Sequence, residues 1–216
     1  MAYWGMDISE YPGDNVMKDL KDQTYLKWTG FYLAPTPYRT DVSWMNKLST
    51  LKAQGWKTLP IYLGKQLGDS NLTFAKGKVD ADDAIAKAKS AGFTNGAYIY
   101  FDVETGGLLS DEYLQYLGGF FYGLTNEGTY SPGVYCSYKE TADQIKANLN
   151  WNQRYWVYKK TYTTNPIGGA APNPSESGVS YATAWQLALD LKTTVAGHSF
   201  GKIDFSSSTT SNPANT

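Results

Sequence analysis

Short apolar runs alternate with amphipathic helical patterns along most of the chain, and this alternation limits the possible folds more than any other feature. The apolar runs are rich in β-branched and aromatic residues, which favour strands, and helical spacing of apolar residues follows most of them. Strands that alternate with helices predict a parallel sheet. We expect strands at residues 3–8, 29–34, 58–63, 97–103, 133–136, 155–158, 182–187 and 202–205.

Helical patterns occupy the connections between the first six strands, and most begin at a residue that can cap a helix. The pattern changes at residues 161–181, which are rich in Thr, Pro, Gly, Asn and Ser and predict a long loop over one barrel end. Between the last two strands, Gly197 and Gly201 favour a hairpin. We expect helices to begin at Asp14, near Asp41, at Asp80, at Ser110, and at a capping box formed by Ser137 and Glu140.

Eight strands close naturally into a barrel. The sequence therefore predicts an α/β fold, a single (β/α)8 TIM-type barrel that is modified because its late helices are missing or short. An open doubly wound sheet is the alternative, but it would need a glycine-rich phosphate loop after strand one, and residues 7–10 do not form one. We expect the barrel domain to cover residues 1–206, with residues 207–216 as a disordered tail or linker stub.

Composition argues against several function classes. The net charge of −1 provides no electrostatic footprint for nucleic acid or an anionic membrane, and no stretch is apolar enough to span a bilayer. One cysteine, Cys136, and one histidine, His198, predict neither a disulfide nor a zinc site, so we expect no metal and no cofactor. The first strand begins almost at Met1, which predicts synthesis in the cytoplasm without a signal peptide. We expect a monomer.

Acidic residues lie at the predicted ends of strands, where a barrel carries its functional groups. Asp102 and Glu104 are two residues apart in an extended segment, so their side chains point the same way, with Cα atoms roughly 6–7 Å apart. Repulsion and burial can keep one carboxyl protonated while the other is ionised, which is the pairing that glycoside hydrolysis needs. A structural pair that caps the following turn is the alternative. Asp7 and Asp204 join the candidates because a barrel brings strands one, four and eight to one mouth.

Aromatic content is high, with 18 Tyr and 7 Trp. A tyrosine-rich core accounts for most of these rings, and the functional interpretation is that some line a sugar groove, where a flat ring stacks on the apolar face of a pyranose. Several of them, and two glutamines, fall on or beside the predicted strands. The candidate substrate-binding residues are Tyr32, Tyr62, Gln66, Tyr100, Tyr135, Tyr158, Trp185 and Gln186.

These residues resemble those of a known group of enzymes. Residues 3–9, the Asp-Val-Glu of residues 102–104, and residues 132–137, 185–186 and 201–204 resemble the strands of family 25 lysozyme-like glycoside hydrolases. Residues 30–35, residues 59–64 and the following Gln66 are similar to a related group, the glycoside-hydrolase-like domains of the family DUF1906. The resemblance runs in order over roughly residues 3–206.

The resemblance implies a barrel that hydrolyses peptidoglycan or another N-acetylated glycan, with its site of action at the cell wall or outside the cell. It implies that Glu104 is the general acid and base. It also implies that the acetamido group of the substrate acts as an internal nucleophile, which Asp102 holds in position, and that Asp7 and Asp204 shape the site. Two departures stand against this. The third strand lacks the histidine that the lysozymes carry nearby, and Ser206 stands where Asn is common. The alternative is a degenerate barrel that binds cell-wall glycan without cleaving it.

Overall fold

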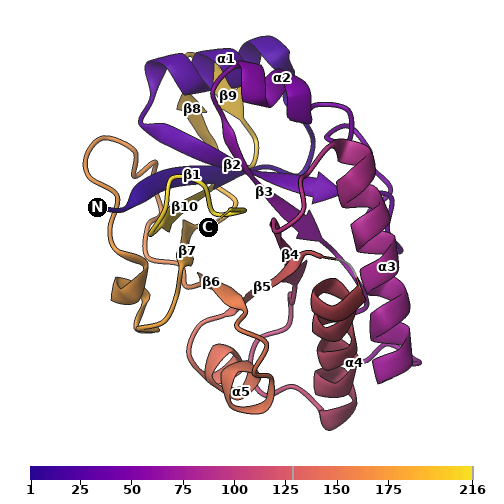
Figure 1. The fold of residues 1–216 in the computed structure, drawn as a ribbon. Helices are drawn as coiled ribbons and strands as arrows, with labels where there is room; N and C mark the ends of the chain where they lie inside the picture. The colour runs from indigo at the N-terminus through magenta and orange to yellow at the C-terminus, as the bar shows by residue number, and fades with distance from the viewer. Residues whose placement is uncertain (128, 216) are drawn as a thin grey trace.

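Eight strands follow one another around a closed barrel in the order β1-β10-β7-β6-β5-β4-β3-β2, in a computed structural model that describes residues 1–127 and 129–215 (Figure 1). Every predicted strand is present, with its ends moved by a few residues. The modified α/β barrel that the sequence predicts is therefore confirmed. The strands are β1 (Tyr3–Asp7), β2 (Leu26–Leu33), β3 (Lys57–Tyr62), β4 (Tyr98–Asp102), β5 (Ser131–Ser137), β6 (Arg154–Tyr158), β7 (Ala184–Ala188) and β10 (Asp204–Ser208).

The last strand of the barrel runs against its neighbours. β10 pairs antiparallel with both β1 and β7, whereas the other seven strands are parallel. The predicted hairpin before it is present as β8 (Thr193–Val195) and β9 (His198–Phe200), which pair with each other outside the barrel. Because β10 is reversed, its first residue, Asp204, lies at the mouth where the parallel strands end, directly opposite Asp7.

Helices cover the barrel between its first six strands, and the described residues after β6 contain only a short 3₁₀ turn, η2 (Pro174–Ser177). A π-helical turn, η1 (Gly123–Glu127), extends α4. Figure 1 shows the helices packed around the outside of the barrel, with α3 and α4 side by side. The helices are α1 (Asp14–Gln23), α2 (Leu48–Ala53), α3 (Phe74–Ala91), α4 (Asp111–Tyr122) and α5 (Glu140–Asn148).

Several predicted helix starts are wrong. The chain from Asp41 forms turns until α2 begins at Leu48. α3 begins earlier than predicted, capped by Thr73, and Asp80 lies buried in its middle, where it accepts a hydrogen bond from the Tyr116 hydroxyl at 2.7 Å. A local capping pattern cannot reveal such a tertiary contact. Neither Asp14 nor Ser137 caps a helix, since Gly13 and Lys139 hold the N-cap positions without a side-chain bond, whereas Ser110 does cap α4.

Successive residues of each strand point to opposite sides. One set fills the barrel interior, and the other packs against the outer helices. The interior is aromatic, and glycines make room for the large rings. A Cβ atom on Gly5 would come within 2.0 Å of the Trp28 ring, and one on Gly133 within 2.7 Å of the Tyr100 ring. The buried interior cluster comprises Trp28, Leu59, Ile61, Tyr98, Tyr100, Trp156 and Ala184.

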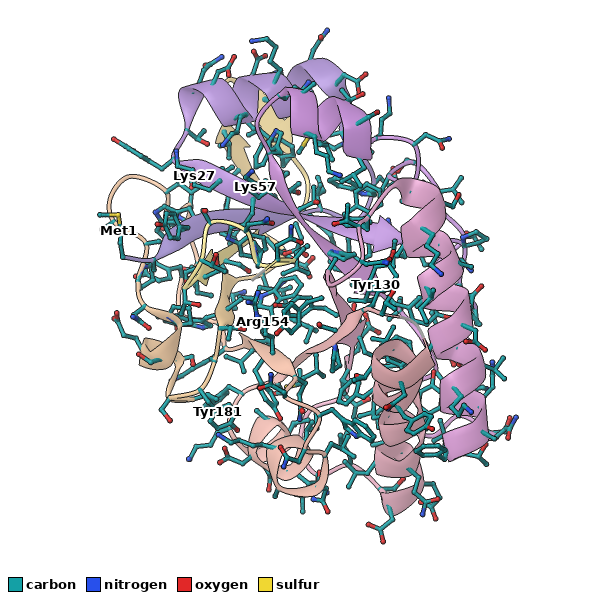
Figure 2. The ribbon with its side chains drawn as sticks, in the orientation of Figure 1. Met1, Lys27, Lys57, Tyr130, Arg154 and Tyr181 are labelled. Atoms are coloured by element: carbon teal, nitrogen blue, oxygen red, sulfur yellow. The ribbon has the colours of Figure 1, made fainter. Side chains whose placement is uncertain are left out.

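The segment after β10 closes the barrel at the end opposite the mouth. The main-chain N–H of Tyr98 donates to the carbonyl of Ala214 at 2.7 Å, and the Tyr100 hydroxyl donates to the carbonyl of Pro213 at 3.2 Å. Arg154 donates to the carbonyls of Pro213 and Asn215 and lies beside this segment in Figure 2. The sequence predicts a disordered tail here, but in the structure residues 213–215 pack against the barrel and form its floor. The contacts are made by main-chain carbonyls, which the polar composition of the segment does not reveal. No helix among the described residues is long and apolar enough to cross a membrane.

Candidate functional site

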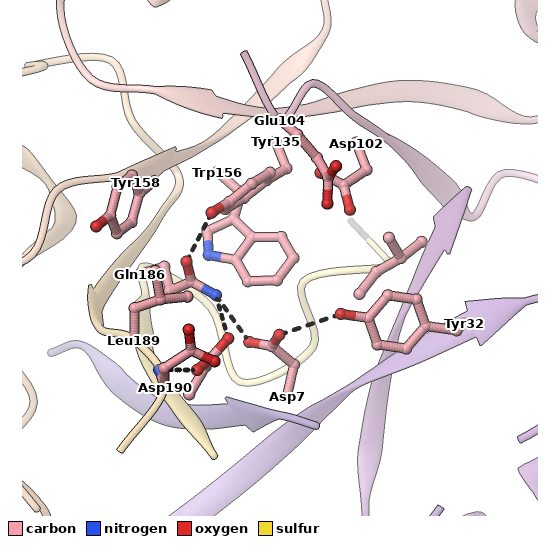
Figure 3. Close-up of a pocket in the computed structure, with 12 residues that line it drawn as sticks. Asp7, Tyr32, Asp102, Glu104, Tyr135, Trp156, Tyr158, Gln186, Leu189 and Asp190 are labelled. Atoms are coloured by element: carbon pink, nitrogen blue, oxygen red, sulfur yellow. Dashed lines mark hydrogen bonds between the residues drawn. The ribbon is translucent and has the colours of Figure 1, made fainter. Parts of the chain in front are cut away.

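The mouth of the barrel holds a pocket of about 350 Å³ (Figure 3). All eight strands of the barrel contribute inward-facing residues from their mouth ends, and the chain just beyond β4 and β7 completes the wall. All four acids that the sequence selects line this pocket. Its lining residues are Asp7, Tyr32, Ile61, Asp102, Glu104, Tyr135, Trp156, Tyr158, Gln186, Leu189, Asp190 and Asp204.

Asp102 and Glu104 share one side of the pocket but differ in their surroundings (Figure 3). Asp102 is only 8% exposed, and its Oδ1 atom is buried without a hydrogen-bond partner, whereas Glu104 is exposed to solvent. Burial raises the pKa of Asp102 to about 8, repulsion from the Glu104 carboxylate adds to the shift, and the Arg39 guanidinium opposes it. The two carboxyls are therefore unequal in burial, and the pKa of the buried one, Asp102, is raised.

Gln186 connects the acids on the other side of the pocket. Its Nε2 donates to Asp7 Oδ1 at 3.3 Å and to Asp204 Oδ2 at 3.2 Å, while its Oε1 accepts from the Tyr135 hydroxyl at 2.7 Å. The Tyr32 hydroxyl donates to the second oxygen of Asp7 at 3.4 Å. Two facing carboxyls are thus held by a neutral amide, a contact that orients them without neutralising a charge.

Burial is the main influence on the ionisation of these two carboxyls. Burial raises the pKa of Asp7 to about 7; the hydrogen bond from Gln186 lowers it, and repulsion from Asp102 raises it. Burial is also the largest cause at Asp204, whose pKa is raised to about 8, with a further contribution from Asp7. These carboxyls therefore retain protons well above the usual pH range for aspartate.

The sequence predicts that Gln66 binds the substrate, but Gln66 is not among the residues that line the pocket. Its Nε2 donates to the main-chain carbonyl of Asp102 at 2.8 Å, and its Oε1 accepts from the main-chain N–H of Glu104 at 3.1 Å. Both ends of the amide are therefore bonded to the segment that carries the two carboxyls. Gln66 fixes the main chain on either side of Val103, and so it positions Asp102 and Glu104.

Three of the six predicted rings line the pocket, namely Tyr32, Tyr135 and Tyr158. The Arg39 guanidinium packs over the Tyr32 ring, 3.9 Å from the ring centre. Figure 3 shows Tyr135 and Tyr158 on the wall between Glu104 and Gln186. These rings give the acidic pocket apolar faces on which a sugar ring could stack.

The other three predicted rings do not line the pocket. Tyr62 points outward and donates to Asp83 of α3 at 2.9 Å. Trp185 also points outward and donates to the carbonyl of Lys159. Tyr100 points into the barrel but lies near its floor, on Pro213. On β7 the alternation of inward and outward residues excludes Trp185 once Gln186 is placed in the pocket, whereas β3 carries no acid or amide that would exclude Tyr62 in the same way.

Sequence reasoning missed several residues of the pocket. Trp156 lies two residues before Tyr158 on β6 and therefore on the same face, and its Nε1 donates to Ser206 at 3.1 Å. Asp190 donates its main-chain N–H to Asp204 at 2.6 Å. The alternation of β6 could have identified Trp156, whereas Asp190 belongs to a connection with no periodic signal. Ile61 and Leu189 complete the missed lining residues.

Among the described residues, no group of three or more His, Cys, Asp or Glu side chains has an arrangement that could hold a metal ion. The carboxyls of the pocket are instead separated by Gln186 and by aromatic rings. The chemistry that the arrangement itself supports is therefore proton transfer and hydrogen bonding by carboxyl groups, beside aromatic surfaces.

Solved structures share this fold. A bacterial lysozyme from Streptomyces coelicolor superposes with a TM-score of 0.66 at 14% identity, covering 99% of this chain and 97% of the lysozyme chain. The Tat-secreted protein Rv2525c of Mycobacterium tuberculosis, in complex with HEPES, gives 0.64 at 14% identity over 99% and 97%. The modular autolysin LytC of Streptococcus pneumoniae, in complex with a synthetic peptidoglycan ligand, gives 0.65 at 17% identity over 95% of this chain and 46% of LytC.

The sequence itself identifies the family. No protein with a curated functional description matches it. A family model does match, over residues 19–206, which include Asp102, Glu104 and Asp204. That model describes the Rv2525c-like, glycoside hydrolase-like domain, the group that the motifs of the sequence resemble. The chain belongs to the family of Rv2525c-like, glycoside hydrolase-like domains.

Proposed function

We propose that this protein is a glycoside hydrolase that cleaves peptidoglycan or a related N-acetylated glycan at the barrel mouth. The observation that carries the proposal is the unequal pair in one pocket: exposed Glu104 beside buried Asp102, whose Oδ1 has no partner in the protein. Because both carboxyls line the same pocket, one ligand can contact the exposed acid and the buried acid together.

Glu104 is the proton donor in this proposal. It gives its proton to the glycosidic oxygen as the bond to the anomeric carbon breaks, and its carboxylate later takes a proton from the attacking water. The acetamido oxygen of the substrate attacks the anomeric carbon in the first step. Asp102, which lines the same pocket, accepts a hydrogen bond from the acetamido N–H, and so holds that group in position for the attack.

In this proposal, the residues on the other side of the pocket bind the sugar and determine the shape of the site. Asp7 and Asp204, held by Gln186, offer carboxyl groups to sugar hydroxyls, and Tyr32, Tyr135 and Tyr158 offer ring faces. Membership in a glycoside hydrolase-like family supports this assignment, as does the shared fold with a lysozyme and with an autolysin crystallised on a peptidoglycan ligand.

Incubation with purified peptidoglycan and with chitin oligomers tests the proposal, with the products identified by mass spectrometry. We expect cleavage by the wild type and a loss of about 10²–10⁴ in rate in Glu104→Gln, which retains the shape but not the titrating proton. Glu112→Gln is the matched control, since Glu112 is exposed at the start of α4 and outside the pocket. Binding without any cleavage by the wild type would instead establish a degenerate barrel, and equal turnover in both variants would exclude Glu104 as the acid.

A further inference from the structure

Exposed apolar side chains gather around the mouth of the barrel. Loops that follow β2, β4, β5 and β6 carry five of them, whereas the pocket itself holds only about 350 Å³. A pocket of this size accommodates a small part of a polymer, so the remainder of a polymeric ligand has to lie on the rim. The exposed side chains are Tyr38, Val42, Leu108, Tyr138 and Tyr162.

Tyr138 is the exposed ring that is most directly continuous with the pocket. Its main-chain N–H donates to the carbonyl of Tyr158 at 2.9 Å, and Tyr158 lines the pocket. The two residues are thus neighbours across the ends of β5 and β6, about one strand spacing apart. The Tyr138 side chain is 42% exposed, so a ligand that leaves the pocket past Tyr158 meets it next.

Lys159 gives this part of the rim a fixed positive charge. Its ammonium lies 4.7 Å from the centre of the Tyr138 ring and donates to the carbonyl of Ser177 at 2.6 Å. That bond uses one of three N–H donors and leaves the others for a ligand. The pocket, in contrast, is lined by five carboxyl groups and by no lysine or arginine. An anionic substituent therefore finds a cationic partner on the rim beside Tyr138 that the lining of the pocket does not offer.

We propose that Tyr138 and Lys159 form a second glycan-binding site, which takes the sugar unit next to the one in the pocket together with its carboxylate-bearing substituent. The ring stacks on the sugar, and the ammonium pairs with the carboxylate. This inference rests on the proposed function for the identity of the polymer. It adds the direction in which the glycan runs, over the ends of β5 and β6, and the place of its acidic groups.

Calorimetric binding to a Glu104→Gln protein tests the site without any need for cleavage. The ligands are chitin oligomers of two and six sugars, and peptidoglycan fragments of similar length that carry acidic peptides. We expect Tyr138→Ala to weaken binding of the longer oligomers about tenfold and to leave the disaccharide unchanged, because only long ligands reach the rim. Tyr138→Phe should restore the affinity. Tyr25→Ala is the matched control, an exposed tyrosine that precedes β2 at the opposite end of the barrel.

Lys159→Met separates the two parts of the site. We expect it to remove the preference for the acidic fragments and to leave the chitin oligomers unaffected. Equal loss on short and long oligomers in Tyr138→Ala, or no loss on either, would overturn the proposal, and so would an unchanged preference in Lys159→Met. Failure of the wild type to cleave, with this length dependence intact, would refute the hydrolase assignment and support the second site.

Discussion

Asp7 and Asp204 face each other as direct partners in the antiparallel register of β1 and β10, and one amide nitrogen, Nε2 of Gln186, donates to both. Two buried carboxyls in this arrangement cannot both ionise cheaply, because the amide is neutral. The raised pKa values of Asp7, about 7, and Asp204, about 8, follow mainly from burial, with repulsion from Asp102 adding to the shift at Asp7 and repulsion from Asp7 adding to the shift at Asp204. The burial of these two carboxyls at the mouth of the barrel therefore costs stability at a pH where both would otherwise be ionised.

The first prediction concerns the pH dependence of stability. The pKa of Asp7 is raised from 3.8 in an unperturbed chain to about 7 in the fold, so the folded protein holds this proton over a range in which the unfolded chain releases it. Stability should therefore fall as the pH rises from about 4 to about 8, by on the order of 4 kcal/mol at most for this residue. Asp7→Asn should remove that part of the fall, so its stability relative to the wild type should increase with pH.

Urea unfolding at pH 5, 7 and 8.5 provides the measurement. Asp82→Asn, a change at an exposed position on α3, serves as the control and should show no such trend. A stability difference between wild type and Asp7→Asn that stays constant over this range would mean that Asp7 ionises normally in the fold.

The second prediction concerns the coupling between Asp102 and Glu104. Burial is the main cause of the raised pKa of Asp102, and the Glu104 carboxylate is the next. Glu104→Gln removes the repelling charge, so the pKa of Asp102 should decrease while remaining above its ordinary value. Carbon-13 NMR titration of the aspartate carboxyls measures this shift. An unchanged midpoint would show that the two groups do not interact through the pocket.

The third prediction concerns Gln66, which bonds to the main chain at Asp102 and at Glu104. Gln66→Leu removes both bonds, and a small displacement of the acid should lower kcat by about 10²-fold with little change in KM. Hydrogen exchange of the Glu104 amide should accelerate in the same variant, a readout that does not depend on activity. Gln115→Leu, on the exposed face of α4, is the control. A change in KM alone would indicate that Gln66 binds the substrate instead.

The fourth prediction concerns the close packing of β1 on β2. A Cβ atom on Gly30 would lie 2.7 Å from Cβ of Asp7 and 2.9 Å from Cδ1 of Ile61. Gly30→Ala should therefore destabilise the fold by about 1–3 kcal/mol through overpacking, and should displace Asp7. Gly168→Ala, where no heavy atom lies within 4 Å, should be close to neutral. Equal unfolding midpoints for the two variants would contradict this account of the interior.

The order of strands and the acids at the mouth are predictable because both depend on patterns that are local in the sequence. An apolar run ending in Asp7 or Asp102 predicts both a strand and a carboxyl at its end. Asp204 is different, since the prediction placed it at the mouth without recognising that β10 runs in the opposite direction. Strand direction depends on the path of the preceding connection, and a short connection without helical period carries little information about that path.

The remaining errors concern contacts between distant segments. Tyr100 and Tyr98 lie inside the barrel as their alternation with Asp102 requires, but nothing in the sequence shows that residues 213–215 would cover them. The role of Gln66 depends on two main-chain groups some 36 to 38 residues away. Parity alone separates Gln186 from Trp185, so part of the site could have been predicted more closely.

The reversed last strand has a consequence for how the chain could be rearranged. Tyr3 and Ser208 are paired at the outer ends of β1 and β10, and antiparallel neighbours can be joined by a loop of very few residues. In a regular barrel the first and last strands are parallel, and joining them would need a long crossover. A circular permutant that links β10 to β1 by a short connection, that keeps the carbonyls of residues 213–215 on the floor of the barrel, and that opens within the exposed stretch of residues 161–164, should keep Asp7 beside Asp204 while bringing their strands next to each other in the chain.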